Sequence, residues 1–194
     1  MRRIYFGICF FASALFVAPP IAVFGDEANS YEQLSPNGKY VFVMLSKSPD
    51  TGGKVDTLKQ RYPHSGLYRA NNSRKSLWRV NWYSSHVHIS SDGMHLVRIG
   101  MTNITAINGK PNMAQLALSF YRNGTLIKKY LIENLIPDPR SLFKSRGGFE
   151  WQNRIAFDDA SGRLEATLVT GQVKTFDTKT GNIISAKTAT HRRR

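Results

Sequence analysis

The sequence predicts an all-β fold built from antiparallel meander sheets, and three observations lead to that fold class. Runs of β-branched and aromatic residues, such as Tyr40–Val43 and Leu116–Tyr121, recur along the chain at strand length. Asp92-Gly93 and Asn123-Gly124 separate pairs of such runs, and both dipeptides accept the left-handed backbone of tight hairpin turns. A helical signal arises only over Arg140–Lys144, after a proline.

The N-terminus has the pattern of a secretory signal peptide. Arg2 and Arg3 precede an apolar block, Ile4–Val17, and small residues follow before the first acidic side chain. The block is shorter than the roughly 18 to 20 residues that span a bilayer. We therefore expect cleavage after Gly25, with Ala22 as the alternative position and an uncleaved anchor as the alternative fate. The mature chain is expected to be periplasmic or extracellular, without a transmembrane span.

Removal of residues 1–25 defines the expected domain organisation. Residues 26–188 are expected to form a single all-β domain, and residues 189–194 a basic flexible tail. Cys9 is the one cysteine of the chain and lies in the signal segment, so the mature chain has no disulfide. An exported chain without cysteine is typical of a bacterial envelope.

The mature chain is strongly basic, because 25 Lys and Arg face 13 Asp and Glu, a net charge of +12. Such a balance favours contact with an acidic protein or an anionic envelope polymer. The basic residues are scattered rather than clustered, however, which is also typical of a well-solvated surface. No motif indicates specific recognition of nucleic acid.

The first half of the domain is predicted as short strands and turns. A polar lead-in, Asp26–Leu34, precedes a Pro-Asn-Gly turn and the strand Tyr40–Val43. Residues Lys47–Ser65 are polar, contain Gly and Pro, and lack periodicity, which indicates a long surface loop. Gly66–Arg69 and Leu77–Val80 are expected to pair across a turn rich in Asn and Ser.

The second half continues the meander. His86–Ser90 and Met94–Gly100 pair across Asp92-Gly93, and after a polar loop Leu116–Tyr121 pairs with Thr125–Ile132. Residues 133–148 are irregular and include the possible helical turn. From residue 149 onward, three turn signals separate four strand-like runs, enough for a small sheet.

Three turns of similar composition, each followed by an apolar strand, begin at Ser35 (SPNG), Ser90 (SSDG) and Asp158 (DDASG), and a DTKTG turn begins at Asp177. This pattern resembles the WD40-like blade repeats of β-propellers found in bacterial exported proteins, over most of Ser35–Ile184. The resemblance implies three blade-like repeats. Because closed propellers usually need at least four blades, the alternatives are a partial propeller completed by a partner, an open stack of sheets, or a β-sandwich.

Three histidines lie in the stretch Leu77–Gly100. In the predicted hairpin His88 lies opposite Val97, so His86, His88 and His95 share one face of the strands. Imidazoles gathered in this way are able to ligate a transition metal. Polar-face histidines that hydrogen-bond neighbouring strands are the preferred interpretation, because no carboxylate falls at a matching spacing.

Aromatic and basic residues also gather in sequence around this stretch, and we expect them to be the ligand-binding candidates. Such a surface suits sugars, bases or acidic peptides through stacking and cation–π contacts. The competing interpretation is that the two tryptophans belong to the core. The set comprises Tyr68, Trp78, Arg79, Trp82, Tyr83 and Arg98.

The chain lacks the common catalytic signatures, since it has no G-x-S-x-G, no phosphate-binding glycine loop and no H-E-x-x-H. The preferred hypothesis is therefore an exported, non-enzymatic binding or scaffolding protein that contacts an acidic partner, with no cofactor. The alternative is a metal-dependent or Ser/His hydrolase that uses His86, His88, His95 and Asp92. A third hypothesis is direct recognition of an anionic polymer such as lipopolysaccharide.

Overall fold

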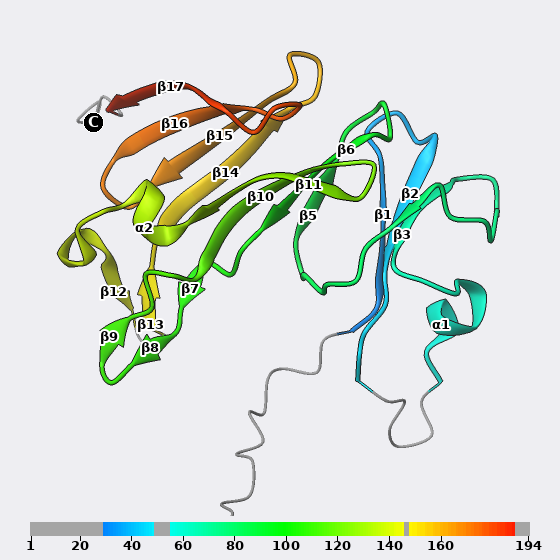
Figure 1. Cartoon of the computed structure of the whole chain (residues 1–194), viewed down its shortest axis with the longest axis horizontal. Coiled ribbons are helices and arrows are strands. Elements are labelled where there is room, and N and C mark those ends of the chain that lie inside the picture. The colour runs from blue at the N-terminus through cyan, green and yellow to red at the C-terminus, as the bar shows by residue number, and fades with distance from the viewer. Residues whose placement is uncertain (1–28, 49–54, 146–147, 189–194) are drawn as a thin grey trace, which may run out of the picture.

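Three four-stranded antiparallel sheets dominate the computed structural model, which describes residues 29–48, 55–145 and 148–188 (Figure 1). Each sheet is a meander whose strands follow chain order, and this arrangement confirms the predicted all-β fold class. The first sheet contains β1 (Tyr31–Leu34), β2 (Tyr40–Met44), β3 (Gly66–Arg69) and β4 (Trp78–Arg79). The middle sheet contains β5 (Val87–Ile89), β6 (His95–Ile99), β10 (Leu116–Arg122) and β11 (Thr125–Leu131). The last sheet contains β14 (Gln152–Asp158), β15 (Arg163–Leu168), β16 (Gln172–Asp177) and β17 (Ile183–Thr188).

Smaller elements fill the connections between the sheets. A three-stranded sheet and a two-stranded sheet are formed by the segment between β6 and β10 and the segment between β11 and β14. Their strands are β7 (Asn103–Ile104), β8 (Ala106–Ile107), β9 (Lys110–Pro111), β12 (Phe143–Ser145) and β13 (Gly148–Glu150). The helices are α1 (Thr57–Arg61), α2 (Ile132–Leu135) and the 3-10 helix η1 (Pro139–Ser141). Within the described ranges, every helix is too short to cross a bilayer. The predicted signal peptide and basic tail lie outside those ranges.

Several local predictions were wrong. The expected polar loop Met101–Met113 contains β7, β8 and β9. The helical turn over Arg140–Lys144 is displaced to η1, with α2 before it and β12 after it. Residues 31–34, expected to be a polar lead-in, form the edge strand β1. Gln33 pairs with Phe42, and this pairing with β2 holds the segment in an extended conformation. The expected loop Lys47–Ser65 contains α1, because the carboxylate of Asp56 caps the helix by accepting from the backbone N–H of Leu58 at 3.0 Å. A five-residue helix is too short to produce a hydrophobic period.

Two hydrophobic cores hold the three sheets together in a row. The first core lies between the first and middle sheets, and includes Phe42 and Leu96. The second lies between the middle and last sheets, and includes Val97 and Leu164. Adjacent residues Leu96 and Val97 enter different cores because side chains alternate across a strand. The strands β6 and β10 of the middle sheet are thus buried on both faces, whereas β11 at its edge is mostly exposed.

The first and last sheets each bury one face in these cores, and their outer faces differ in polarity. On β15, Leu164, Ala166 and Leu168 point inward while Arg163 and Glu165 are exposed, so the outer face of the last sheet is polar. The outer face of the first sheet is apolar, and residues of α1 and its C-terminal end pack on it to form a small hydrophobic cluster. That cluster comprises Val41, Val43, Tyr62 and Tyr68, with Leu45 and Leu58 packed against it.

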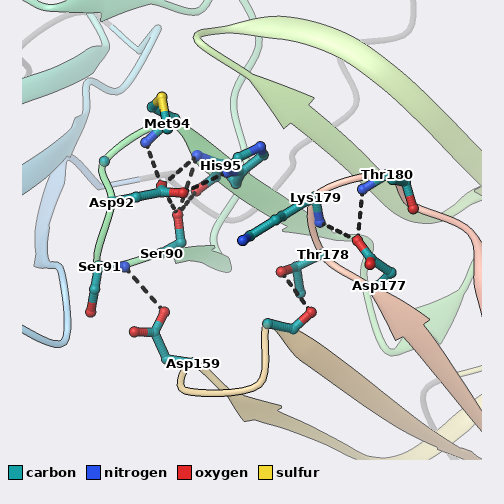
Figure 2. Close-up of polar contacts among 12 residues, drawn as sticks. Ser90, Ser91, Asp92, Met94, His95, Asp159, Asp177, Thr178, Lys179 and Thr180 are labelled. Atoms are coloured by element: carbon teal, nitrogen blue, oxygen red, sulfur yellow. Dashed lines mark hydrogen bonds and ion pairs between the residues drawn. The ribbon is translucent and has the colours of Figure 1, made fainter.

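The three similar turns occupy equivalent places, since each joins the first two strands of its sheet. Asn37 Nδ2 in the first turn donates to the carbonyl oxygen of Ser91 in the second at 2.7 Å. The backbone N–H of Ser91 in turn donates to Asp159 Oδ1 in the third at 3.1 Å (Figure 2). The turns are therefore linked in a line at one end of the stack.

The turn residues and register of the middle hairpin match the prediction. His88 pairs with Val97, as expected from a two-residue turn at Asp92-Gly93. Gly93 has φ +68°, and an added Cβ there would lie 2.8 Å from the ring of Tyr40. Glycine is needed at this position both for its backbone conformation and for the close approach of the neighbouring sheet.

Candidate functional site

A groove of about 460 Å³ opens over the outer face of the first sheet. Its floor comes from β1 and β2, one wall from the C-terminal end of α1, and the other from the end of β3 and the loop that follows. The lining residues are Glu32, Leu34, Val41, Arg61, Tyr62, Arg69, Ala70 and Asn72. None of these belongs to the set that the sequence singled out.

Local sequence explains why the α1 wall stands where it does. The helix ends at Arg61, since Tyr62 is extended ahead of Pro63, and a residue before proline disfavours the helical region. The ring of Tyr62 packs against that of Tyr68, with centroids 4.7 Å apart. Arg74 donates to the carbonyl oxygens of Gln60 at 2.7 Å and Arg61 at 2.9 Å, which ties the loop after β3 to the helix end.

The acidic residue of the groove is compensated by its neighbours. Arg61 Nη1 lies 3.7 Å from Glu32 Oε1, and Arg61 Nη2 donates to Asn72 Oδ1 at 2.6 Å. The guanidinium also lies over the Tyr62 ring, 5.0 Å from its centroid. Burial, followed by the hydrogen bond to Glu32, raises the pKa of Tyr62 to about 12, so its hydroxyl stays a donor at neutral pH.

Arg69 is an exposed arginine at the rim of the groove. Among the described residues, its side chain has no hydrogen bond or ion pair partner within contact distance. It shares the groove with Leu34, of which 61% is exposed, and with the apolar Val41 and Ala70. Because Arg69 pairs with Tyr40, which packs against the first core, its side chain leaves β3 on the side of the sheet opposite Val41 and Tyr68. Arg69 therefore adds positive charge at the rim of the groove and not over its apolar floor.

The three histidines have separate environments. His86 is exposed with Nδ1 3.0 Å from Ser85 Oγ, and the ring of His88 stacks on Phe157 with centroids 3.7 Å apart. Burial lowers the pKa of His88, although nearby Asp159 opposes the shift. His95 is buried. Within the described ranges, no three His, Cys, Asp or Glu side chains are grouped so that they could hold a metal ion.

His95 belongs to a hydrogen-bond network inside its turn (Figure 2). Its Nδ1 lies 2.8 Å from Asp92 Oδ2, and Asp92 Oδ1 accepts from the backbone N–H of Met94 at 2.7 Å and from the Ser90 hydroxyl. Burial opposes ionisation of Asp92, but these hydrogen bonds together outweigh it and lower the pKa to about 2. The serine of a catalytic triad donates to the imidazole, whereas Ser90 contacts the carboxylate. The geometry supports a turn-stabilising role.

The six aromatic and basic candidates do not form one surface, because Tyr68 and Trp78 lie on opposite faces of the first sheet and Arg98 is on the middle sheet. Tyr68 is fully buried in the outer cluster, where its hydroxyl donates to the carbonyl oxygen of His64 at 2.7 Å. Trp78 is 9% exposed in the first core, and its Nε1 donates to the carbonyl oxygen of Gly93 at 2.9 Å. Arg79 is exposed, with Nε donating to Ser76 Oγ at 3.2 Å. The core interpretation of Trp78 is confirmed.

Trp82, Tyr83 and Arg98 form a seam between the first and middle sheets. The Arg98 guanidinium lies 4.7 Å from the centroid of the Trp82 ring and donates to the carbonyl oxygen of Tyr83 at 2.9 Å. Its Nε is buried without a partner among the described residues. Tyr31 extends the seam by donating to the carbonyl oxygen of Ser84 at 2.7 Å, and burial raises its pKa. The seam joins sheets, so it is less open to a ligand than the groove.

Sequence reasoning missed the groove residues Arg61, Tyr62 and Arg69. The available signal was weak. The sequence predicts the long segment Lys47–Ser65 as a surface loop, and loops of this length are often mobile or functional. This segment contains the Arg-Tyr-Pro sequence that forms one wall.

No protein-family model and no curated protein matches the chain. Among solved structures, the chain is similar to one titled "Structure of U3-55K", with 13% identity and a TM-score of 0.39. The match covers 86% of this chain and 41% of that one. A similarity this low carries no functional argument, so the site must be interpreted from its own chemistry.

Proposed function

We propose that the protein is an exported, non-enzymatic binding or scaffolding module that contacts an acidic partner through the groove of the first sheet. The observation that carries this proposal is the charge around the groove: Arg69 at its rim has no ion-pair partner among the described residues, and the one acidic lining residue, Glu32, is already engaged by Arg61 and Tyr62. An incoming anion would meet uncompensated positive charge there. The net charge of the mature chain would strengthen the encounter at long range.

The shape of the groove supports a partner with an apolar portion. Leu34 lines the groove with 61% of its surface exposed, and Val41 and Ala70 continue the apolar floor. A bare polyanion would satisfy the arginine and leave this floor uncovered. An acidic protein segment satisfies both, which is why we place it ahead of an envelope polysaccharide.

The stack of sheets supports the scaffolding part of the proposal. Each of the three sheets is a four-stranded meander, as in the blade-like units that the sequence resembles. Their outer edges and turns offer several surfaces around one rigid body. We include export in the proposal because of the N-terminal sequence, and N-terminal sequencing of the protein recovered from its native host tests it. A mature start at Asp26 is expected, and an intact N-terminus would count against export.

Poly-glutamate is a simple probe for the groove. Binding to the mature chain is expected to weaken steeply as salt rises, because charge contacts are screened. The variant Arg69→Glu is expected to bind about tenfold more weakly, equivalent to about 1.4 kcal/mol. Arg154→Glu is the matched control, since Arg154 is an exposed arginine on β14 of the last sheet. Equal weakening by both variants would indicate diffuse surface charge and contradict the groove.

A further inference from the structure

β11 and β17 are edge strands of adjacent sheets, β11 of the middle sheet and β17 of the last (Figure 1). The turn before β17 packs against the middle of β11. Lys128 Nζ donates to Asn182 Oδ1 in this turn at 2.7 Å. Tyr130 Oη donates to the carbonyl oxygen of Gly181 at 2.8 Å. The two strands therefore form one continuous surface at the rim of the stack, which we call the β11–β17 edge.

Each strand of this edge contains a β-bulge, and in both strands the extra residue is an isoleucine. On β11, Leu126 and Lys128 pair with adjacent residues of β10, so Ile127 between them has no partner of its own. Ile184 is the extra residue of β17 in the same way. A bulge interrupts the alternation of side chains along a strand and re-aims the residues around it. The two sheets thus share a local irregularity at equivalent strands.

The bulges leave two neighbouring aliphatic side chains exposed on each strand. Leu126 and Ile127 expose 47% and 40% of their surface, and Ile183 and Ile184 expose 39% and 51%. A bulged edge is a poor template for an added strand, because its backbone groups do not match a regular partner. The partner that these side chains suit is therefore apolar in part and is not another β-strand.

β11 and β17 carry lysines and no other charged residue. Lys128 and Lys129 follow the bulge of β11, and Lys187 lies on β17. None of the three has an ion-pair partner among the described residues. Asp177 lies at the start of the turn before β17, where its Oδ1 accepts from two backbone N–H groups of the turn (Figure 2). The edge thus combines positive charge without ion pairs and exposed aliphatic side chains.

We propose that the β11–β17 edge binds the surface of a membrane that contains anionic lipids. This inference concerns a different surface from the groove and goes beyond the proposed function. Lysine ammonium groups are attracted to anionic headgroups, while aliphatic side chains enter the boundary between headgroups and acyl chains. A lipid surface accommodates two separate apolar projections without a matching shape, whereas a protein partner needs a complementary surface. Lipid therefore fits this edge better than an acidic protein does.

Vesicle co-sedimentation of the mature chain tests the inference. Vesicles of phosphatidylcholine with phosphatidylglycerol carry negative charge, and vesicles of phosphatidylcholine alone carry none. Binding is expected on the anionic vesicles only, and it should weaken as salt rises because the charge contacts are screened. Binding to neither kind of vesicle, or equally to both, would overturn the inference.

A pair of lysine variants locates the charge contacts. Lys129→Gln/Lys187→Gln is expected to bind anionic vesicles at least about tenfold more weakly than wild type. Lys39→Gln/Lys110→Gln is the matched control, since both of its lysines are exposed and lie outside the edge. Equal weakening by the two double variants would indicate diffuse surface charge and contradict the edge as the binding surface.

A second pair of variants tests the aliphatic contacts without changing charge. Ile127→Ser/Ile184→Ser is expected to keep its fold, because both side chains are exposed at bulges. Its affinity for anionic vesicles should fall at least about fivefold, since less apolar surface enters the lipid. Met101→Ser/Ile107→Ser alters exposed apolar residues elsewhere and should bind as wild type does. Unchanged affinity of the isoleucine variant would contradict contact of this edge with lipid.

Poly-glutamate separates this inference from the proposed function. Lys129→Gln/Lys187→Gln leaves the groove residues unaltered and is expected to bind poly-glutamate as wild type does. An equal loss of affinity for poly-glutamate and for vesicles would show that the edge binds polyanions in general, and would overturn the assignment to lipid. If vesicles fail to bind while poly-glutamate binds, this inference fails and the groove proposal stands.

Discussion

Replacing Asp92 by asparagine removes the negative charge and one acceptor oxygen at the centre of the middle turn, and leaves the shape of the side chain almost unchanged. The carboxylate accepts from the Met94 backbone at 2.7 Å, from the Ser90 hydroxyl, and contacts His95 Nδ1 at 2.8 Å. Its pKa falls from the ordinary 3.8 to about 2 in the fold. A pKa that is lower in the folded than in the unfolded state stabilises the fold, and this difference corresponds to about 2 kcal/mol in the free energy of unfolding at neutral pH. Asp92 is partly exposed, so we expect Asp92→Asn to cost about 1 to 2 kcal/mol.

Urea denaturation at several pH values measures this cost. A carboxylate whose pKa is lowered by folding contributes stability above its unfolded value, and loses it as pH falls through the folded value. The difference between wild type and Asp92→Asn should therefore be largest near neutral pH and shrink between about pH 4 and pH 2. Asp138→Asn is the control, because Asp138 is exposed and pairs locally with Arg140. A difference below about 0.5 kcal/mol, or one independent of pH, would refute the stabilising role of this network.

Two further predictions concern packing between the sheets. Gly93→Ala should destabilise by about 2 kcal/mol or more in urea, because φ is positive and the new methyl would lie 2.8 Å from an aromatic ring. Gly109→Ala, also at positive φ but in open space, should cost only about 1 kcal/mol, and equal costs would contradict the close approach. Arg98→Lys should lower the free energy of unfolding by about 1 kcal/mol, because the guanidinium that lies over the Trp82 ring is lost. The tryptophan fluorescence should change as well. An unchanged emission spectrum would show that the cation does not contact the indole.

The hairpins of the fold could be predicted from sequence because their signals are local. Asp92-Gly93 and Asn123-Gly124 specify tight turns, and pairing His88 with Val97 follows by counting outward from the first of them. β1 was missed because Glu32 and Gln33 have low strand propensity, so the segment is extended only through its pairing with β2. α1 was missed because five residues with a cap carry too little periodicity.

The groove could not be predicted for a different reason. It joins β1, the end of α1 and the loop after β3, and Glu32 lies 40 positions from Asn72 in the sequence. Such contacts are fixed by tertiary packing, here by Tyr62 on Tyr68 and by Arg74 on the helix end. The sequence instead directed attention to Trp78 and its neighbours, whose large apolar area buries them in the first core.

Hydrogen exchange of the backbone amides, measured with and without poly-glutamate, tests the groove most directly. Bound anion is expected to slow exchange in residues 31–34 and 60–74, where β1, the end of α1 and the loop after β3 meet. The seam around Trp82 and Arg98 should exchange at the same rate in both conditions. Protection confined to that seam, or spread evenly over the basic surface, would contradict the assignment of the groove as the binding site.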